Sequence, residues 1–178
     1  LGHAALVPLA DGTCLALASE RGQTAAPFFG PQETAFADFL CRATGEDYVR
    51  GDSVLSGFGL AQLHRFLTGQ ALAPEQVSRQ LTAESPTTAL FARFYGRAAR
   101  DYALAMLAAG GVYISGGVAA KNPVLVAHPE FAREFLASPT YGALLGSIPV
   151  RLVRDADVGL FGAAAIARSL LDPKPPKG

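Results

Sequence analysis

The first thirty residues alternate short apolar runs with turn-forming residues. His3–Leu9 and Thr13–Ala18 are apolar runs joined by Ala10-Asp11-Gly12. An Asp-Gly turn between two β-compatible runs predicts a hairpin. The next stretch, Ser19–Pro31, is interrupted by Gly and Pro residues, so an irregular loop is expected there.

Helical periodicity dominates the middle of the chain. Apolar side chains recur every three or four residues, which predicts helices with one face on a core. The expected helices cover Gln32–Cys41, a segment from Asp52 or Ser53 to Gly69, Pro74–Leu81, and a long helix from Ser85 to Gly110-Gly111. In the long helix, Ser85 is expected at the N-cap and Pro86 at the first helical position. Gly57 and Gly59 weaken the start of the second helix, which indicates a close packing contact or the approach of a ligand.

The last third of the chain alternates helices and strands. The expected order is a strand at Val112–Ser115, a helix at Pro123–Leu136 interrupted at Pro129, a strand at Val150–Val153, and a helix at Gly159–Leu171 behind a capping Asp157. A hairpin, a block of helices and then this alternation predict an α/β fold. We expect residues 1–172 to form one domain and residues 173–178 to be a disordered tail.

Composition narrows the classes of function. Half of the residues are hydrophobic and 17% are charged, which favours a folded domain over a disordered chain. Lys plus Arg and Asp plus Glu number 15 each, so no net charge attracts nucleic acid. No apolar run approaches the roughly 18–20 residues of a membrane span. We therefore expect no nucleic-acid or membrane partner.

Cysteine and histidine residues are few and scattered. Cys14 and Cys41 stand alone, which indicates reduced thiols rather than a disulfide framework or a zinc site. His3, His64 and His128 form no metal-binding spacing or catalytic triad pattern. No metal site is expected on this chain.

A pair of glycines follows the first buried strand. Gly116 and Gly117 stand directly after Ser115, at the carboxyl end of the strand, where open α/β sheets bind ligands. Because glycine has no Cβ, a phosphate or flat ligand can approach the backbone amides there. A tight strand exit without any ligand accounts for the same pair. The two interpretations remain open on local chemistry alone.

Three blocks of sequence carry a resemblance to a known family. The blocks are Val54-Leu55-Ser56-Gly57-Phe58-Gly59-Leu60, Val112-Tyr113-Ile114-Ser115-Gly116-Gly117-Val118, and Ile148-Pro149-Val150-Arg151-Leu152-Val153 followed by Gly159-Leu160-Phe161-Gly162-Ala163-Ala164. In order and spacing they resemble bacterial glucokinases, which belong to the actin-like (ribonuclease H-like) sugar kinase superfamily. The resemblance extends over most of the chain, from Leu1 to Leu171.

The resemblance implies that the chain is the C-terminal domain of such an enzyme. The family's N-terminal domain, with its Asp-Gly-Gly-Thr phosphate loop and catalytic Asp, would lie upstream, so no catalytic residue is expected here. Leu1-Gly2 would end the family's GTGLG turn, which places Gly2 with Gly116 and Gly117 on the nucleotide side. The implied activity is cytoplasmic, ATP- and Mg²⁺-dependent phosphorylation of glucose to glucose 6-phosphate, the first step of glycolysis. A homodimer and contact with its own N-terminal domain are the implied assemblies.

The same resemblance suggests sugar-binding residues. Glu20-Arg21-Gly22-Gln23 aligns with the family's Glu-Gly-Gly-His, whose Glu and His bind glucose hydroxyls. Glu20 keeps the carboxylate, whereas Gln23 can donate a hydrogen bond but cannot take up a proton. Asp52 stands where the family has a second Glu. Glu20 as a solvated loop residue and Asp52 as a helix cap are the alternatives.

Arg93, Arg97 and Arg100 lie on one stripe of the long helix. A solvated face is expected there, with a dimer contact as the alternative.

Two other functions are compatible with the same residues. The repressor/ORF/kinase group of sugar kinases shares the fold, but it carries a Cys-rich zinc motif that Cys14 and Cys41 do not reproduce. A non-catalytic sugar or nucleotide sensor is the second alternative, because Arg21 and Gln23 depart from the family's sugar motif. The preferred hexose and the phosphoryl donor, whether ATP, ADP or polyphosphate, are left open.

Overall fold

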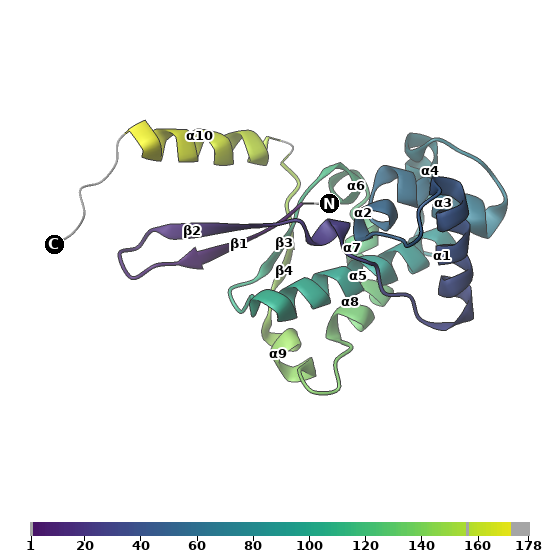
Figure 1. Cartoon of the computed structure of the whole chain (residues 1–178), viewed down its shortest axis with the longest axis horizontal. Coiled ribbons are helices and arrows are strands. Elements are labelled where there is room, and N and C mark those ends of the chain that lie inside the picture. The colour runs from purple at the N-terminus through teal and green to yellow at the C-terminus, as the bar shows by residue number, and fades with distance from the viewer. Residues whose placement is uncertain (1, 156, 172–178) are drawn as a thin grey trace.

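The long helix α5 lies at the centre of the helical part of the molecule (Figure 1). The computed structural model describes residues 2–155 and 157–171. Its strands are β1 His3–Pro8, β2 Cys14–Ser19, β3 Val112–Ile114 and β4 Val150–Leu152. Its helices are the 3₁₀ turn η1 Arg21–Gln23, α1 Gly30–Thr44, α2 Gly51–Val54, α3 Gly57–Thr68, α4 Pro74–Gln80, α5 Pro86–Met106, α6 Gly117–Lys121, α7 Val124–Ala127, α8 Pro129–Leu136, α9 Gly142–Ser147 and α10 Val158–Leu171.

The predicted hairpin is confirmed. β1 and β2 pair antiparallel, from His3 opposite Ser19 to Pro8 opposite Cys14. Asp11 shapes the turn, because its Oδ1 accepts hydrogen bonds from the Thr13 backbone N–H (2.9 Å) and hydroxyl (2.6 Å). Gly12 has a φ of +82°, a conformation that favours glycine.

The second pair of strands makes the fold α/β, as predicted. β3 and β4 pair in parallel, with Val112 opposite Val150 and Ile114 opposite Leu152. The connection between them holds α6, α7, α8 and α9, and Pro129 begins α8, which confirms the expected interruption. The short helices α6 and α9 were not predicted, because neither is long enough to show an apolar period.

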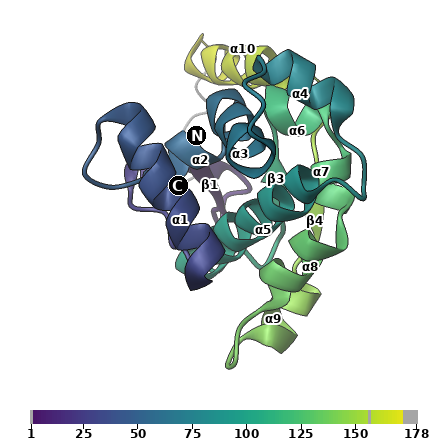
Figure 2. The ribbon, with the colours of Figure 1, turned by 90° about the vertical axis from the view of Figure 1, so that its right-hand side faces the viewer.

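Helix α5 lies in the middle of the helical body (Figure 2), where it packs against α8, α7 and α3. Its Phe94 ring lies 5.9 Å from the Phe36 ring of α1. On the side of α8, Gly96 allows the two helices to approach closely. A Cβ at position 96 would lie only 2.2 Å from the carbonyl oxygen of Phe131. The core therefore depends on glycine at this crossing.

The helix expected from Asp52 or Ser53 to Gly69 is two helices. The chain leaves the helical path at Leu55-Ser56, and the Ser56 hydroxyl caps α3 by accepting the Gly59 N–H (3.1 Å). Gly59 packs against α2, where a Cβ would lie 1.9 Å from the Val54 carbonyl oxygen. Asp52 lies within α2, whose N-cap is Arg50, so the prediction that Asp52 caps a helix beginning after it is wrong.

The long helix ends earlier than expected. α5 stops at Met106, and the next residue, Leu107, has a φ of +45° that turns the chain away from the helical path. The apolar spacing that continues to Ala109 does not show this break, because it depends on a single backbone conformation.

The arginine stripe of α5 faces other helices, with Arg97 buried and Arg93 and Arg100 partly buried, so the expectation of a solvated face is wrong. Arg97 is 2% exposed and donates two hydrogen bonds to Glu33 of α1, at 2.6 and 3.1 Å. It also donates to Glu134 of α8 (3.2 Å). Arg93 lies 3.5 Å from Glu33. These side chains join three helices, and we call them the ion network: Glu33, Arg93, Arg97, Glu130, Glu134.

Opposing effects set the pKa values within this network. Burial raises the pKa of Glu33, but hydrogen bonds from Arg97 and from the Phe29 N–H, with the charges of Arg97 and Arg93, bring it below its usual value. Burial lowers the pKa of Arg97. Its hydrogen bonds to Glu33 and Glu134, with their negative charges, raise the pKa by more than burial lowers it, so the net shift is upward. Both side chains are therefore charged at neutral pH.

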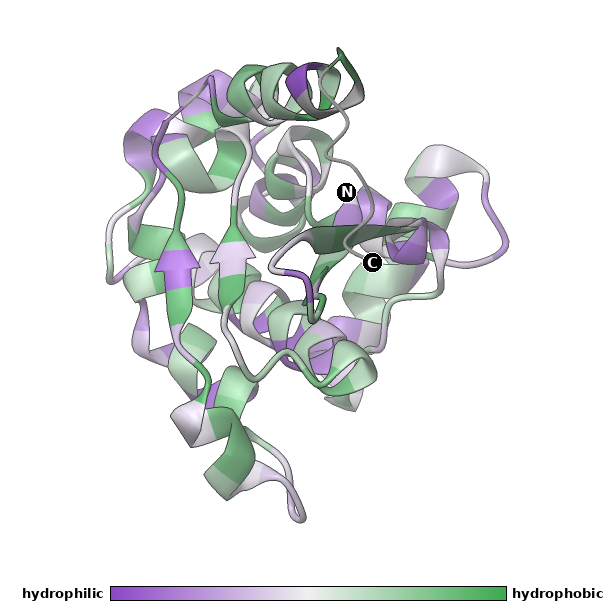
Figure 3. Cartoon of the chain, turned by 90° about the vertical axis from the view of Figure 1, so that its left-hand side faces the viewer, coloured by the Kyte–Doolittle hydropathy of each residue, from purple (hydrophilic) through white to green (hydrophobic). Residues whose placement is uncertain are grey.

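The hairpin and α10 extend away from the helical body (Figure 1). Both carry exposed apolar side chains. The green of the hairpin ribbon in Figure 3 marks its hydrophobic residues. Leu6 on β1 is 72% exposed and Leu160 on α10 is 68% exposed. None of the helices that the structure describes has the length and apolar character needed to cross a bilayer. The tail predicted at residues 173–178 lies outside the described residues.

Candidate functional site

The turn η1 brings the predicted sugar-binding residues to the start of α2. It follows β2 directly, and the Glu20 carbonyl accepts the Gln23 N–H (2.9 Å). The Gly51 N–H donates to the Thr24 carbonyl (3.1 Å), and a Cβ at Gly51 would lie 3.4 Å from the Gly22 carbonyl oxygen. The backbones of η1 and α2 are therefore in close contact.

Gln23 and Asp52 meet across this contact. The Gln23 Nε2 donates to the Asp52 Oδ2 at 3.4 Å. On its other side, the Gln23 Oε1 accepts a hydrogen bond from the Arg50 guanidinium at 2.5 Å. Arg50 also forms an ion pair with Glu46. We call these four side chains the Gln23 cluster: Glu46, Arg50, Gln23, Asp52.

Glu20 lies beside this cluster at the open end of the hairpin. Its side chain is exposed, and among the described residues no hydrogen bond or ion pair occupies its carboxylate. Because His3 pairs with Ser19, Gly2 and Glu20 are the next residues on the two strands. The register thus places Gly2, predicted on the nucleotide side, close to Glu20, predicted on the sugar side.

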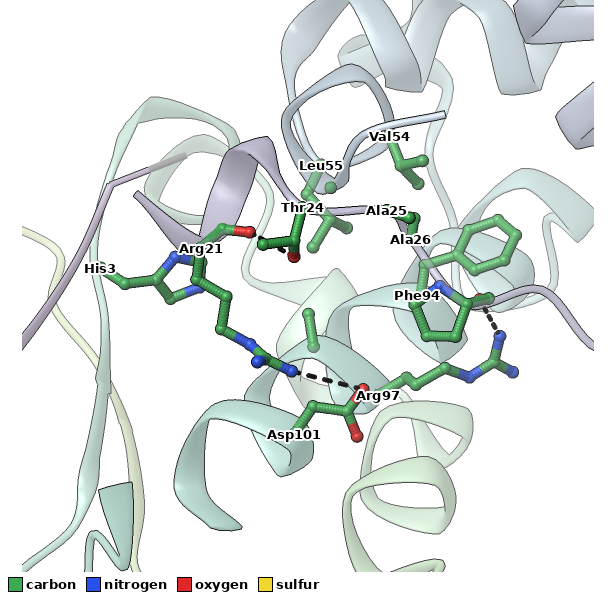
Figure 4. Close-up of a pocket in the computed structure, with 13 residues that line it drawn as sticks. His3, Arg21, Thr24, Ala25, Ala26, Val54, Leu55, Phe94, Arg97 and Asp101 are labelled. Atoms are coloured by element: carbon green, nitrogen blue, oxygen red, sulfur yellow. Dashed lines mark hydrogen bonds and ion pairs between the residues drawn. The ribbon is translucent and has the colours of Figure 1, made fainter. Parts of the chain in front are cut away.

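A pocket lies between this loop and α5 (Figure 4). Its empty volume is about 490 Å³, including open solvent at its mouth. Arg21 and Thr24 line it from above, and Arg97 and Asp101 line it from α5. The Arg21 guanidinium approaches the Asp101 carboxylate to 4.0 Å. Arg21, which replaces a glycine of the family motif, therefore links η1 to α5.

Gly116 and Gly117 lie at the carboxyl end of β3, where α6 begins. Gly116 has a φ of +112°, which strains any other residue. Gly117 has no such constraint, and a Cβ there would meet nothing within 4 Å. Both residues are exposed. The backbone is therefore open to solvent at the position where the sequence predicts a nucleotide.

The site offers hydrogen-bonding groups for an uncharged polar ligand. Carboxylates of Glu20 and Asp52 accept from hydroxyl groups, and the Gln23 amide both donates and accepts. Within the described parts of the chain, no three His, Cys, Asp or Glu side chains are grouped closely enough to hold a metal ion.

Sequence reasoning missed Arg50. No motif marks this residue, and its only signal is its place directly before Gly51-Asp52. Its contact with Gln23 joins residues 27 positions apart and depends on how η1 folds back on α2.

Comparisons with known proteins agree with the resemblance. A family model described as Glucokinase matches residues 1–170. A glucokinase of Agrobacterium fabrum (strain C58) is 32% identical over 140 residues, which cover 72% of this chain and 41% of the relative. A glucokinase of Xanthomonas euvesicatoria pv. vesicatoria is 29% identical over 177 residues, which cover 94% of this chain and 52% of the relative. The chain spans about half the length of these curated relatives.

Solved structures give the same result. A glucokinase from an Antarctic psychrotroph superposes with a TM-score of 0.79 at 28% identity, over 94% of this chain and 55% of that one. A Balamuthia mandrillaris glucokinase in complex with glucose also has a TM-score of 0.79, over 94% and 51% of the two chains. At 18% identity, the second likeness shows the fold alone. Since the family model covers nearly all of the sequence, the chain belongs to the glucokinase family.

Proposed function

We propose that this chain is the C-terminal, sugar- and nucleotide-binding domain of an enzyme that transfers the γ-phosphoryl group of ATP to the 6-hydroxyl of glucose. Its fold would be the large domain of an actin-like ATPase, and the reaction would take place in the cytoplasm. The proposal is carried by the contact of Gln23 with Asp52 beside Glu20. These are the residues that the family resemblance assigns to the sugar.

On the sugar side, the carboxylates and the amide would hold glucose by its hydroxyl groups. Hydrogen bonds to charged groups are stronger than those between neutral groups, so Glu20 and Asp52 would contribute most. Gln23 would donate from Nε2, as the family's His donates from its ring. Fixing the hexose in one orientation aligns its 6-hydroxyl with the incoming phosphate, and such positioning is a large part of phosphoryl-transfer catalysis.

On the nucleotide side, Gly116 and Gly117 would let the ligand approach the backbone at the end of β3. Gly2 would approach it from the start of β1. Mg²⁺ bound with ATP neutralises charge on the phosphate oxygens in this class of reaction. The base that accepts the proton of the sugar hydroxyl would come from an N-terminal domain.

The exposed apolar surface supports an N-terminal domain as a partner. β1 and β2 have apolar side chains exposed on both faces, including Leu6, Leu15 and Leu17. α10 likewise exposes Leu160 and Phe161. Large apolar patches of this kind mark interfaces. A domain of about the size by which the relatives exceed this chain would cover them, and closure of the two domains would exclude water from the sugar.

We expect the full-length protein to form glucose 6-phosphate from glucose and ATP, and the isolated chain to form none. The isolated chain lacks the phosphate loop and the base that the family carries elsewhere. A coupled assay for glucose 6-phosphate, with circular dichroism to show that the chain is folded, measures both. Product from the isolated chain would contradict the division into domains. Glucose binding by the full-length protein without product would favour the sensor.

Gly117→Val in the full-length protein is expected to weaken ATP binding about tenfold, equivalent to ~1.4 kcal/mol. The space around a Cβ at position 117 is open within the chain, so the branched side chain would obstruct the ligand and not the fold. Gly110→Val is the matched control, because Gly110 is equally open and precedes the other end of β3. Calorimetry with ATP measures the affinity. Equal ATP affinity in the two variants would mean that Gly116 and Gly117 form a tight strand exit and do not bind the nucleotide.

A further inference from the structure

We propose that Arg50 is a positioning residue for the sugar site, which sets the direction in which the Gln23 amide presents its donor. This inference rests on the proposed function. Gln23 stands where the family has a His, and its terminal amide can rotate. Its oxygen and nitrogen have nearly the same shape, so rotation by half a turn exchanges donor and acceptor.

Arg50 is held in place before any ligand arrives. Its Nε donates to the Glu46 Oε2 at 3.3 Å, and a second guanidinium nitrogen bonds to the Glu46 Oε1. The Ser53 hydroxyl approaches the Glu46 Oε2 to 3.5 Å from the other side. The backbone of Arg50 is fixed as well, because it forms a β-bridge with Ala25 and provides the N-cap of α2. The guanidinium is thus oriented by Glu46, with one nitrogen directed at Gln23.

A guanidinium donates hydrogen bonds and accepts none. The Gln23 atom at 2.5 Å from Arg50 must therefore be the amide oxygen, and Nε2 must face Asp52. The reversed amide would place its oxygen against the Asp52 carboxylate and its N–H groups against the guanidinium, and both contacts would be repulsive. Arg50 and Asp52 therefore select the same orientation from opposite sides.

The selected orientation leaves Gln23 useful to a sugar. Nε2 has two hydrogens, of which one points to Asp52. The second would donate to a hydroxyl oxygen of the ligand, and the Asp52 carboxylate would be the neighbouring acceptor. Donor and acceptor thus lie next to each other, which suits a pair of neighbouring hydroxyls. Without Arg50, only the longer contact with Asp52 would favour this orientation, so the amide would spend less of its time in the orientation that binds.

The test is Arg50→Met in the full-length protein, which keeps the length of the side chain and removes its donors. We expect KM for glucose to rise about five- to tenfold, roughly the loss of one well-placed hydrogen bond, while kcat changes less than about twofold. KM for ATP is expected to stay the same. Arg50→Lys, with one donor group, is expected to recover part of the affinity. Arg79→Met on α4, which lies outside the Gln23 cluster, is the control.

A double-mutant cycle separates positioning from a general structural role. Gln23→Met removes the amide that Arg50 positions, so adding Arg50→Met to it should change KM for glucose by less than about twofold. An undiminished effect of Arg50→Met in that background would overturn the inference, and so would an unchanged KM in the single variant. If Arg50→Met does not fold by circular dichroism, Arg50→Lys replaces it in the cycle. A wild-type protein that forms no glucose 6-phosphate would contradict the proposed function itself.

Discussion

Arg97→Met is expected to lower the free energy of unfolding by about 3–5 kcal/mol, the cost of removing one partner from a buried ion pair. The reason is Glu33, which is 2% exposed and would lose both hydrogen bonds from the guanidinium. Arg93 remains 3.5 Å from Glu33, so the lower end of the range is expected. The Pro27 carbonyl, which accepts from Arg97 at 2.9 Å, would also lose its donor.

Urea unfolding followed by circular dichroism at pH 7 measures this loss. Arg133→Met is the matched control, because Arg133 also pairs with a glutamate of α8 but is exposed, and such pairs contribute under about 1 kcal/mol. A similar small loss for Arg97→Met would mean that packing, and not the charges, holds α1, α5 and α8 together.

The effect of pH on this pair has a definite sign. In the wild type the pKa of Glu33 is below its usual value, so its contribution to stability is complete above the pKa of the unfolded chain. It is lost as the pH falls through the lower, folded pKa. In Arg97→Met, burial would raise the pKa of Glu33, and protonation would relieve the penalty. The difference in stability between wild type and variant should therefore narrow from pH 7 to pH 5.

Local signals predicted the elements that depend on local chemistry. The hairpin follows from Asp11-Gly12, and α8 begins at Pro129 because proline suits the first helical turn. The break between α2 and α3 at Leu55-Ser56 was not predicted. It depends on a contact between the two helices, in which Gly59 packs on the Val54 carbonyl. Helical spacing alone continues through that point without interruption.

For Arg97, the residue type and the helical spacing predict opposite degrees of burial. It lies three residues after Phe94, so the helical period places it on the same side as a core phenylalanine. Its charge nevertheless indicated solvent, because arginine is rarely buried without a partner. The partner, Glu33, is 64 positions away in the sequence. A contact of this kind becomes visible only when α1 and α5 are placed together.

The candidate site divides in the same way. The resemblance predicted Glu20, Gln23 and Asp52, and the structure brings the last two into contact across 29 positions. It did not predict the contact of Arg50 with Gln23 or the approach of Arg21 to Asp101, because Arg50 stands at no motif position and Arg21 replaces a motif glycine. The chain differs from the motif at Arg21 and Gln23. These two residues contact Asp101 and Arg50, respectively.

Glu20→Gln is expected to have the largest effect on the proposed activity. A carboxylate that accepts hydrogen bonds from two sugar hydroxyls contributes about 1.5–3 kcal/mol. In the full-length protein its loss should weaken glucose binding by roughly tenfold to a hundredfold. The amide keeps the shape of the side chain and one acceptor oxygen. Because Glu20 is exposed and its carboxylate has no partner among the described residues, stability should barely change.

Steady-state kinetics with varied glucose, and calorimetry with ATP alone, measure this effect. ATP affinity in the absence of sugar should be unchanged, because the proposed nucleotide side consists of other residues, Gly2, Gly116 and Gly117. Glu75→Gln is the control, since Glu75 is an exposed carboxylate on α4, away from the hairpin. If KM and kcat of Glu20→Gln both stay within about twofold of the wild type, then Glu20 is a solvated loop residue. The assignment of Gln23 would then fail with it, because both rest on the same four-residue match.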